Sequence, residues 1–112
     1  MDRSAERVAR NDAIFREANE RISDKAAAEK MTEEIPFLCE CAEERCTEIV
    51  QLSHGEYESI RENATDFLNA PGHEVAAGQY GEVVERNHRY VILRKKGAAA
   101  EIVEQLDPRT PA

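Results

Sequence analysis

The chain contains no tryptophan and few aromatic residues: three phenylalanines and three tyrosines, 5% of its 112 residues. Its hydrophobic core must therefore be built mainly from aliphatic side chains. In a single domain of this size such a core stabilises the fold only modestly, because a small domain buries a limited share of its surface. A bound metal ion would add stability that the core alone does not provide.

The sequence also lacks a long hydrophobic run. No apolar stretch approaches the ~20 residues that a membrane-spanning helix needs, and the first residues have none of the apolar character of a signal peptide. We therefore expect a cytoplasmic protein that does not contact membranes. Thiols stay reduced in the cytoplasm, and an odd number of cysteines, three, argues further against a disulfide framework.

Basic residues are scarce in the middle of the chain. The formal net charge is −8, and residues 35–75 hold nine acidic and two basic residues, a local charge of −7. Residues 82–96 reverse this balance with five basic and two acidic residues, a local charge of +3. Proteins that bind nucleic acid normally present a basic face to the phosphates, so we do not expect a nucleic-acid partner.

All three cysteines, Cys39, Cys41 and Cys46, lie within eight positions. In an extended chain, side chains two residues apart point to the same face, so Cys39 and Cys41 can bind one ion. Residues 42–45 give the chain room to turn and to bring Cys46 back to that ion. Three buried thiols without a metal are the alternative. We favour metal ligands, because clustered thiols in a reduced protein are typical of metal sites.

A four-coordinate site needs one more ligand than the cysteines supply. His73 follows the turn signal Pro71-Gly72, which would direct its side chain back toward an ion held by an earlier loop. Three thiolates and one imidazole are a common structural arrangement for zinc. We therefore predict a Zn²⁺ site, with His54 as an alternative fourth ligand and an unligated turn histidine as the alternative role of His73. The predicted ligands are Cys39, Cys41, Cys46 and His73.

Residues 4–30 predict one long helix. The segment has no proline or glycine, and Val8, Phe15 and Ile22 recur every seven residues as an apolar stripe. Ser4 can serve as the N-cap. The stripe predicts packing on the chain's own domain. If the chain has a partner, we expect a protein, or a second copy of the chain in a homodimer, bound through this N-terminal helix.

Short elements are predicted around the cysteines. Pro36 favours an extended chain before them, and residues 47–52 and 65–68 have the composition of short strands. Ser53, with Glu56 three residues later, predicts a helix that begins with a capping box.

A β-hairpin is predicted near the C-terminus. Residues 82–86 and 89–94 are the expected strands, with Asn87-His88 as a two-residue loop. This loop would place Val84 opposite Val91 and Val83 opposite Ile92. We expect residues 76–81, just before the hairpin, to be a linker.

Together these elements predict an α+β fold. A long N-terminal helix would be followed by a small metal-stapled domain with short strands, one short helix, a β-hairpin and a C-terminal helix over residues 98–106. We expect residues 1–34 to form the helical segment, residues 35–106 the metal-binding α+β domain and residues 107–112 a mobile tail.

Several short motifs follow one another in a fixed order: residues 15–22, Phe37-Leu38-Cys39-Glu40-Cys41, Cys46-Thr47-Glu48, Glu56-Tyr57, Ala70-Pro71-Gly72-His73-Glu74 and Val83-Val84-Glu85-Arg86. This CxCx4C…PGHE pattern resembles a family of small, uncharacterised actinobacterial proteins over roughly residues 14–96. The resemblance implies that Cys39, Cys41, Cys46 and His73 belong together. It implies no activity.

Three classes of function follow from these observations. We expect a small zinc-binding protein that acts as a regulatory or protein-interaction module, because a closed Cys3His site leaves no open position for chemistry. One alternative is a redox or metal sensor whose thiolates release zinc on oxidation or hold an iron–sulfur cluster. The other is a small zinc enzyme with an open three-Cys site and Glu40, Glu43 or Glu74 as general base. The chain has no phosphate loop, HExxH motif or nucleophile elbow to support an enzyme.

Overall fold

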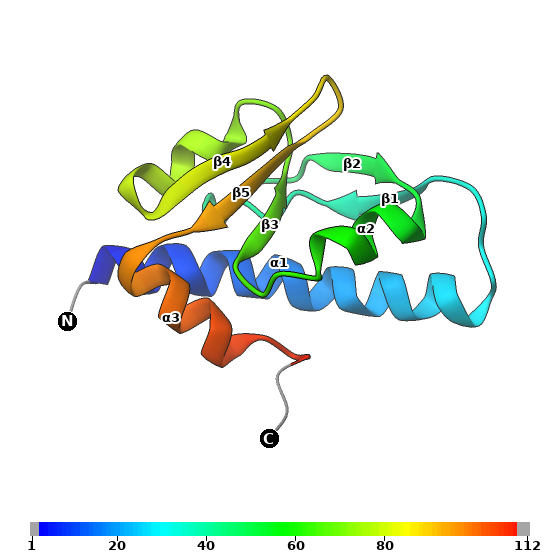
Figure 1. Cartoon of the computed structure of the whole chain (residues 1–112), viewed down its shortest axis with the longest axis horizontal. Helices are drawn as coiled ribbons and strands as arrows, with labels where there is room; N and C mark the ends of the chain where they lie inside the picture. The colour runs from blue at the N-terminus through cyan, green and yellow to red at the C-terminus, as the bar shows by residue number, and fades with distance from the viewer. Residues whose placement is uncertain (1–2, 110–112) are drawn as a thin grey trace.

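A computed structural model describes residues 3–109 and shows the predicted α+β fold. Helix α1 runs along one side of the molecule with α3 beside it, and the strands lie above both helices (Figure 1). Within residues 3–109, no helix is both long and apolar enough to cross a membrane. The elements in chain order are α1 (Arg3–Ala28), β1 (Ile35–Leu38), β2 (Ile49–Leu52), α2 (His54–Ile60), β3 (Asp66–Asn69), the 3-10 helix η1 (His73–Tyr80), β4 (Gly81–Arg86), β5 (Val91–Lys95) and α3 (Gly97–Leu106).

The strands form two small antiparallel sheets. β1 pairs with β2, and the second sheet has the strand order β3-β5-β4. α1 contributes buried side chains to two hydrophobic clusters: Ala26 joins a cluster around Phe37 and Tyr57, and Val8 joins one around Phe67. The helix is therefore part of the hydrophobic core. It begins at Arg3, so Ser4, the predicted N-cap, lies in its first turn.

The buried face of α1 is largely polar, which the apolar stripe did not predict. Asp12, Arg16 and Asn19 are at most 1% exposed, whereas Phe15 and Ile22 are only half-buried. Polar side chains at such positions need partners, because an unpaired buried polar group costs free energy. The partners come from segments far along the chain, so the hydrophobic pattern of the helix could not reveal this face.

Arg16 and Asp12 show which partners this face has. The Arg16 guanidinium donates hydrogen bonds to the carbonyl oxygens of Ala64 and Asp66, and it lies 3.5 Å from the centroid of the Phe67 ring. Asp12 forms a buried ion pair with Lys95, whose ammonium lies 5.0 Å from the same ring. The Phe67 ring thus lies within cation–π distance of both cations.

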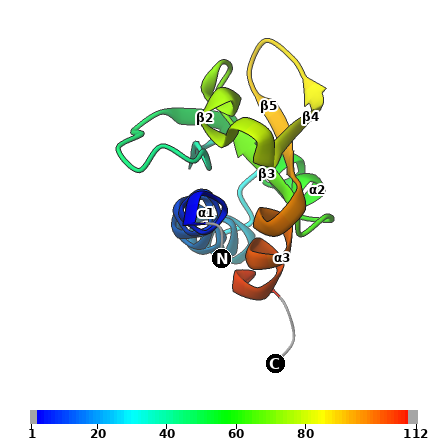
Figure 2. The same ribbon diagram turned by 90° about the vertical axis from the view of Figure 1, so that its left-hand side faces the viewer.

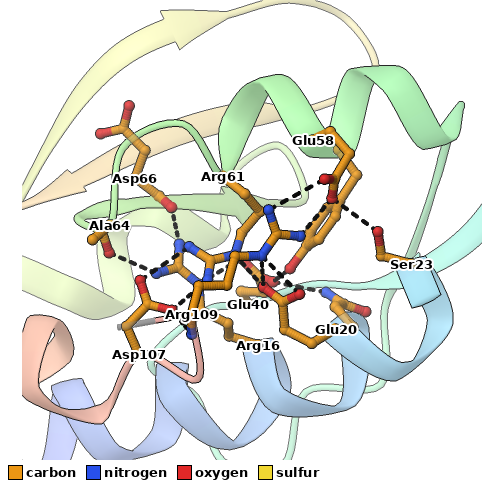
Figure 3. A network of polar contacts seen from close by, with 12 residues as sticks. Arg16, Glu20, Ser23, Glu40, Glu58, Arg61, Ala64, Asp66, Asp107 and Arg109 are labelled. Atoms are coloured by element: carbon orange, nitrogen blue, oxygen red, sulfur yellow. Dashed lines mark hydrogen bonds and ion pairs between the residues drawn. The ribbon is translucent and has the colours of Figure 1, made fainter. Parts of the chain in front are cut away.

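A second polar network joins α1 and α2 to the end of the chain (Figure 3). The Arg61 side chain is fully buried; its Nε lies 2.5 Å from Glu20 Oε1, and its Nη2 lies 2.5 Å from Asp107 Oδ1. Arg109 forms ion pairs with Glu20 and Glu58. Two residues of the expected tail are therefore tied to the helices. Residues 110–112 of that tail lie outside the described residues.

The hairpin differs from its predicted register. Strand β4 ends at Arg86 and β5 begins at Val91, so the loop has four residues rather than two. The cause is the Asn87 side chain, whose Oδ1 accepts hydrogen bonds from the backbone N–H groups of Arg89 and Tyr90 and widens the turn. A bulge between Val83 and Glu85 shifts the register further.

As a result, Val83 pairs with Leu93 rather than with Ile92, and Val91 pairs with Arg86 rather than with Val84. The expected linker over residues 76–81 is also wrong, because most of it belongs to η1. Ala77 and Tyr80 of that helix are buried against the cluster of Phe67. The capping box of α2 is confirmed: Ser53 and Glu56 exchange hydrogen bonds between side chain and backbone.

The Arg61 network gives a first prediction. Replacing Arg61 with Ala leaves the carboxylates of Glu20 and Asp107 without their buried cation, so we expect the free energy of unfolding to fall by about 3–5 kcal/mol. The control is Arg21, which pairs with Glu17 on the exposed face of α1. Arg21→Ala should lower the free energy of unfolding by less than about 0.5 kcal/mol. Urea unfolding measures both. An equal loss of unfolding free energy in the two variants would show that the Arg61 network does not stabilise the fold.

Candidate metal centre

The predicted ligands come from two loops that the fold brings together. Cys39, Cys41 and Cys46 lie in the connection between β1 and β2, and His73 begins η1 after β3. Their four ligand atoms all lie within 4.8 Å of one another. Residues separated by as many as 34 positions thus form one Cys3His group, which has the composition to bind a metal ion.

The distances within the group suit a tetrahedral ion. His73 Nδ1 lies 3.7 Å from Cys39 Sγ, 3.9 Å from Cys41 Sγ and 3.4 Å from Cys46 Sγ. With zinc–sulfur bonds of about 2.3 Å and zinc–nitrogen bonds of about 2.0–2.1 Å, a tetrahedral site places sulfur and nitrogen about 3.5 Å apart. The side chains therefore need to move little to hold such an ion, and Nδ1 is the histidine nitrogen that faces it.

Glu40, between the first two cysteines, fixes their position. Its side chain is fully buried, and its carboxylate accepts hydrogen bonds from Asn19 Nδ2 (2.9 Å), Tyr57 Oη (2.6 Å) and the backbone N–H of Leu68 (3.1 Å). Side chains alternate along this segment, so the two neighbouring sulfurs point the opposite way, toward His73. The acid anticipated as a general base thus serves as an anchor in the core.

Helix α1 holds the cysteine loop at two further points. Asn19 donates to the carbonyl oxygen of Leu38 and accepts from its N–H, both at 2.8 Å, and Asn11 donates to the carbonyl oxygen of Ala42 at 2.9 Å. The sequence pattern alone did not place these asparagines at the site. Asparagine is a poor helix former, so its presence at two inward positions of a long helix was the available signal.

The turn before His73 has the geometry that its sequence predicts. The backbone N–H of His73 donates to the carbonyl oxygen of Ala70, and Gly72 has φ 91°, so Pro71 and Gly72 occupy the central positions of a type II turn. Only glycine adopts this positive φ without strain. The N–H of Ala70 also donates to Cys39 Sγ at 3.1 Å, so the turn is attached directly to one of the sulfurs.

The three thiols influence one another strongly. A hydrogen bond from Cys39, helped by one from His73, lowers the pKa of Cys41 to about 5. Hydrogen bonding to Cys41 and burial raise the pKa of Cys39, and burial together with the nearby Cys41 raises that of Cys46. These shifts favour ionisation of Cys41 and disfavour that of the other two thiols, since like charges this close repel. A divalent cation would favour the other two thiolates.

The remaining candidate residues lie elsewhere or are already engaged. His54 is in the first turn of α2, with its Nε2 4.0 Å from Glu58, and it is not part of the Cys3His group. Glu74 accepts from the N–H of Gly72 and pairs with Arg86, and these bonds hold its pKa below the usual range despite the opposing effect of burial. Glu43 is exposed and accepts from the backbone of its own loop.

The anchoring role of Glu40 gives a second prediction. Glu40→Ala would leave the Tyr57 hydroxyl, the N–H of Leu68 and one of the two N–H groups of Asn19 Nδ2 without an acceptor, so we expect it to destabilise the fold by about 3 kcal/mol or more and to loosen the cysteine loop. Glu44→Ala removes an exposed acid from the same loop and should be near neutral. Thermal unfolding of both variants makes the comparison. Similar melting temperatures would contradict the anchoring role.

Comparisons of the chain with protein-family models, with curated proteins and with solved structures find no match. The resemblance to the actinobacterial family therefore stays a prediction based on its motifs. What the chain does must be inferred from the chemistry of its own side chains, above all from the Cys3His group that two loops bring together.

Proposed function

We propose that the chain is a small zinc-binding protein in which a structural Cys3His site holds together a surface that acts as a regulatory or protein-interaction module. The observation that carries the proposal is the convergence of Cys39, Cys41, Cys46 and His73, with ligand atoms within 4.8 Å of one another. Thiolate and imidazole are the ligands that zinc prefers in structural sites, and four protein ligands fill its tetrahedral shell.

A structural role is favoured over a catalytic one because four ligands leave no position for a substrate or a nucleophilic water. The carboxylates near the site are also committed to other contacts. Glu40 accepts three hydrogen bonds in the core, and Glu74 is paired with Arg86. Neither is positioned as a free general base.

A structural ion would also supply what the small core lacks. It would join the β1–β2 connection to the turn before η1, two segments that already touch where the N–H of Ala70 donates to Cys39 Sγ. Because the site does not exist in the unfolded chain, the free energy of binding the ion would add to the free energy of folding. Removing it should loosen this side of the domain first.

A protein partner fits the surface charges better than nucleic acid does. The three arginines of the hairpin are paired with carboxylates: Arg86 with Glu74, Arg89 with Glu34 and Glu56, and Arg94 with Asp66. Guanidinium groups that are neutralised in this way contribute little to phosphate binding. The local charge of +3 near the C-terminus therefore does not amount to an anion-binding face.

The direct test is metal analysis of protein purified without chelators. We expect about one zinc ion per chain by mass spectrometry, and we expect Cys39→Ser, Cys41→Ser and Cys46→Ser each to lose the ion and part of the stability. Zinc leaves the protein colourless. A brown protein that contains iron and sulfide would instead support the sensor with an iron–sulfur cluster. A fully folded wild type that binds no metal would refute the proposal.

The fourth ligand is tested by a pair of histidine variants. His73→Ala leaves three thiolates, so we expect zinc to pass to a competing chelator at least about tenfold faster than from the wild type. His54→Ala, which lies outside the group, should release zinc at the wild-type rate. Equal rates for His73→Ala and the wild type would remove His73 from the site.

Zinc affinity should also depend on pH. The raised pKa values of Cys39 and Cys46 mean that both are protonated near pH 7, whereas Cys41, at about 5, is already a thiolate. Binding must then displace about two protons, so the dissociation constant should rise about 100-fold for each unit by which the pH falls from 7 toward 6. Competition with a colorimetric zinc chelator at several pH values measures this slope. A dissociation constant that does not change with pH would contradict it.

A further inference from the structure

The exposed side of α1 carries an apolar patch that the metal centre does not use. Ile14, near the middle of the helix, is 65% exposed, and Leu106 at the end of α3 is 37% exposed. The two side chains line a shallow groove of about 250 Å³ together with Arg10, Ala13 and Glu17. α1 and α3 lie side by side on the part of the molecule away from the strands (Figure 2).

We propose that a second copy of the chain docks here, with the two α1 helices antiparallel and crossing at Ile14. In such a two-fold interface each surface meets itself, so any contact of residue i with residue j of the partner is repeated in reverse. Ile14 of each copy would enter the groove between α1 and α3 of the other. Ala13 leaves room for it, because its side chain is small.

The charges beside Ile14 favour this arrangement. Arg10 lies four residues before Ile14 and Glu17 three residues after it, on the same face of the helix. An antiparallel crossing at Ile14 therefore places Arg10 of one copy next to Glu17 of the other, twice in the interface. Within one chain, Arg10 already pairs with Glu6 and Glu17 with Arg21. In the dimer, the Glu6–Arg10 pair of one copy would lie next to the Glu17–Arg21 pair of the other, which gives a row of four charges of alternating sign. The two-fold symmetry produces this row twice.

Two arginines farther from Ile14 limit the angle at which the two helices can cross. Arg7 and Arg21, one turn further out on either side, would face each other in a nearly parallel packing of the two helix axes and would repel. Helices that cross at about −50° touch over only about two turns, which keeps these arginines apart. Contact limited to this extent buries less surface than an obligate dimer does. We therefore expect a reversible dimer that forms at high micromolar concentrations.

Sedimentation of the full chain over a range of concentrations tests the proposal. The wild type should pass from monomer to dimer, and Ile14→Asp should weaken dimerisation by about tenfold or more because it removes an apolar side chain from the centre. Val84→Asp, at an exposed valine on β4, is the matched control and should dimerise like the wild type. A wild type that stays monomeric up to about 1 mM would overturn the proposal.

A charge exchange tests the antiparallel geometry itself. Arg10→Glu and Glu17→Arg each place like charges together and should weaken the dimer. The double variant restores opposite charges across the interface and should recover much of the lost affinity. Failure of the double variant to recover would overturn the pairing. Zinc content of the same samples separates this outcome from the proposed function, since none of these residues belongs to the Cys3His group.

Discussion

The carboxylate of Glu40 connects three elements of secondary structure at one buried point. Its hydrogen bonds reach Asn19 of α1, Tyr57 of α2 and Leu68 of β3, and the residue itself lies in the loop that carries the cysteines. A charged group without access to water is costly unless its acceptor positions are filled. Here three donors fill them, so the position of the loop follows from satisfying this one side chain. The positions of the Cys39 and Cys41 sulfurs are fixed as a result, because both residues are adjacent to Glu40.

This dependence explains why so small a core can hold an ordered site. Phe37 and Tyr57 stack at 4.4 Å between ring centroids, and the Tyr57 hydroxyl then reaches Glu40, so apolar packing and polar bonding meet in one side chain. The other two residues of the Cys3His group, Cys46 and His73, are half-exposed and lie in turns. One half of the site is therefore built into the core, while the other half is presented from the surface.

The sequence predicted well the features that local chemistry determines. The clustering of cysteines, the turn at Pro71-Gly72 and the capping box at Ser53 each depend on neighbouring residues, and the structure contains all three features. The hairpin register was wrong because it depends on how the Asn87 side chain bonds to the backbone and on a bulge at Val84. Neither follows from the alternation of apolar residues.

The buried polar face of α1 could not be predicted for a different reason. Asp12, Arg16 and Asn19 look like surface residues of an amphipathic helix until their distant partners are known. The sequence pattern of a helix shows which side chains lie on each face, but not which distant residues pack against that face. The role of Glu40 was missed in the same way, because an acid next to cysteines resembles a reactive group, whereas its surroundings make it a structural one.

The separation in sequence between α1 and its partners has a consequence for synthesis. Asp12 pairs with Lys95, and Glu20 pairs with Arg109, 89 positions later, so these contacts form only after residues 95 and 109 have left the ribosome. Until then the future inner face of α1 presents charged and amide groups to water rather than a broad apolar stripe. Such an inner face exposes less apolar surface to other nascent chains than an apolar stripe would, so the side chains that order the finished core also limit aggregation before that core forms.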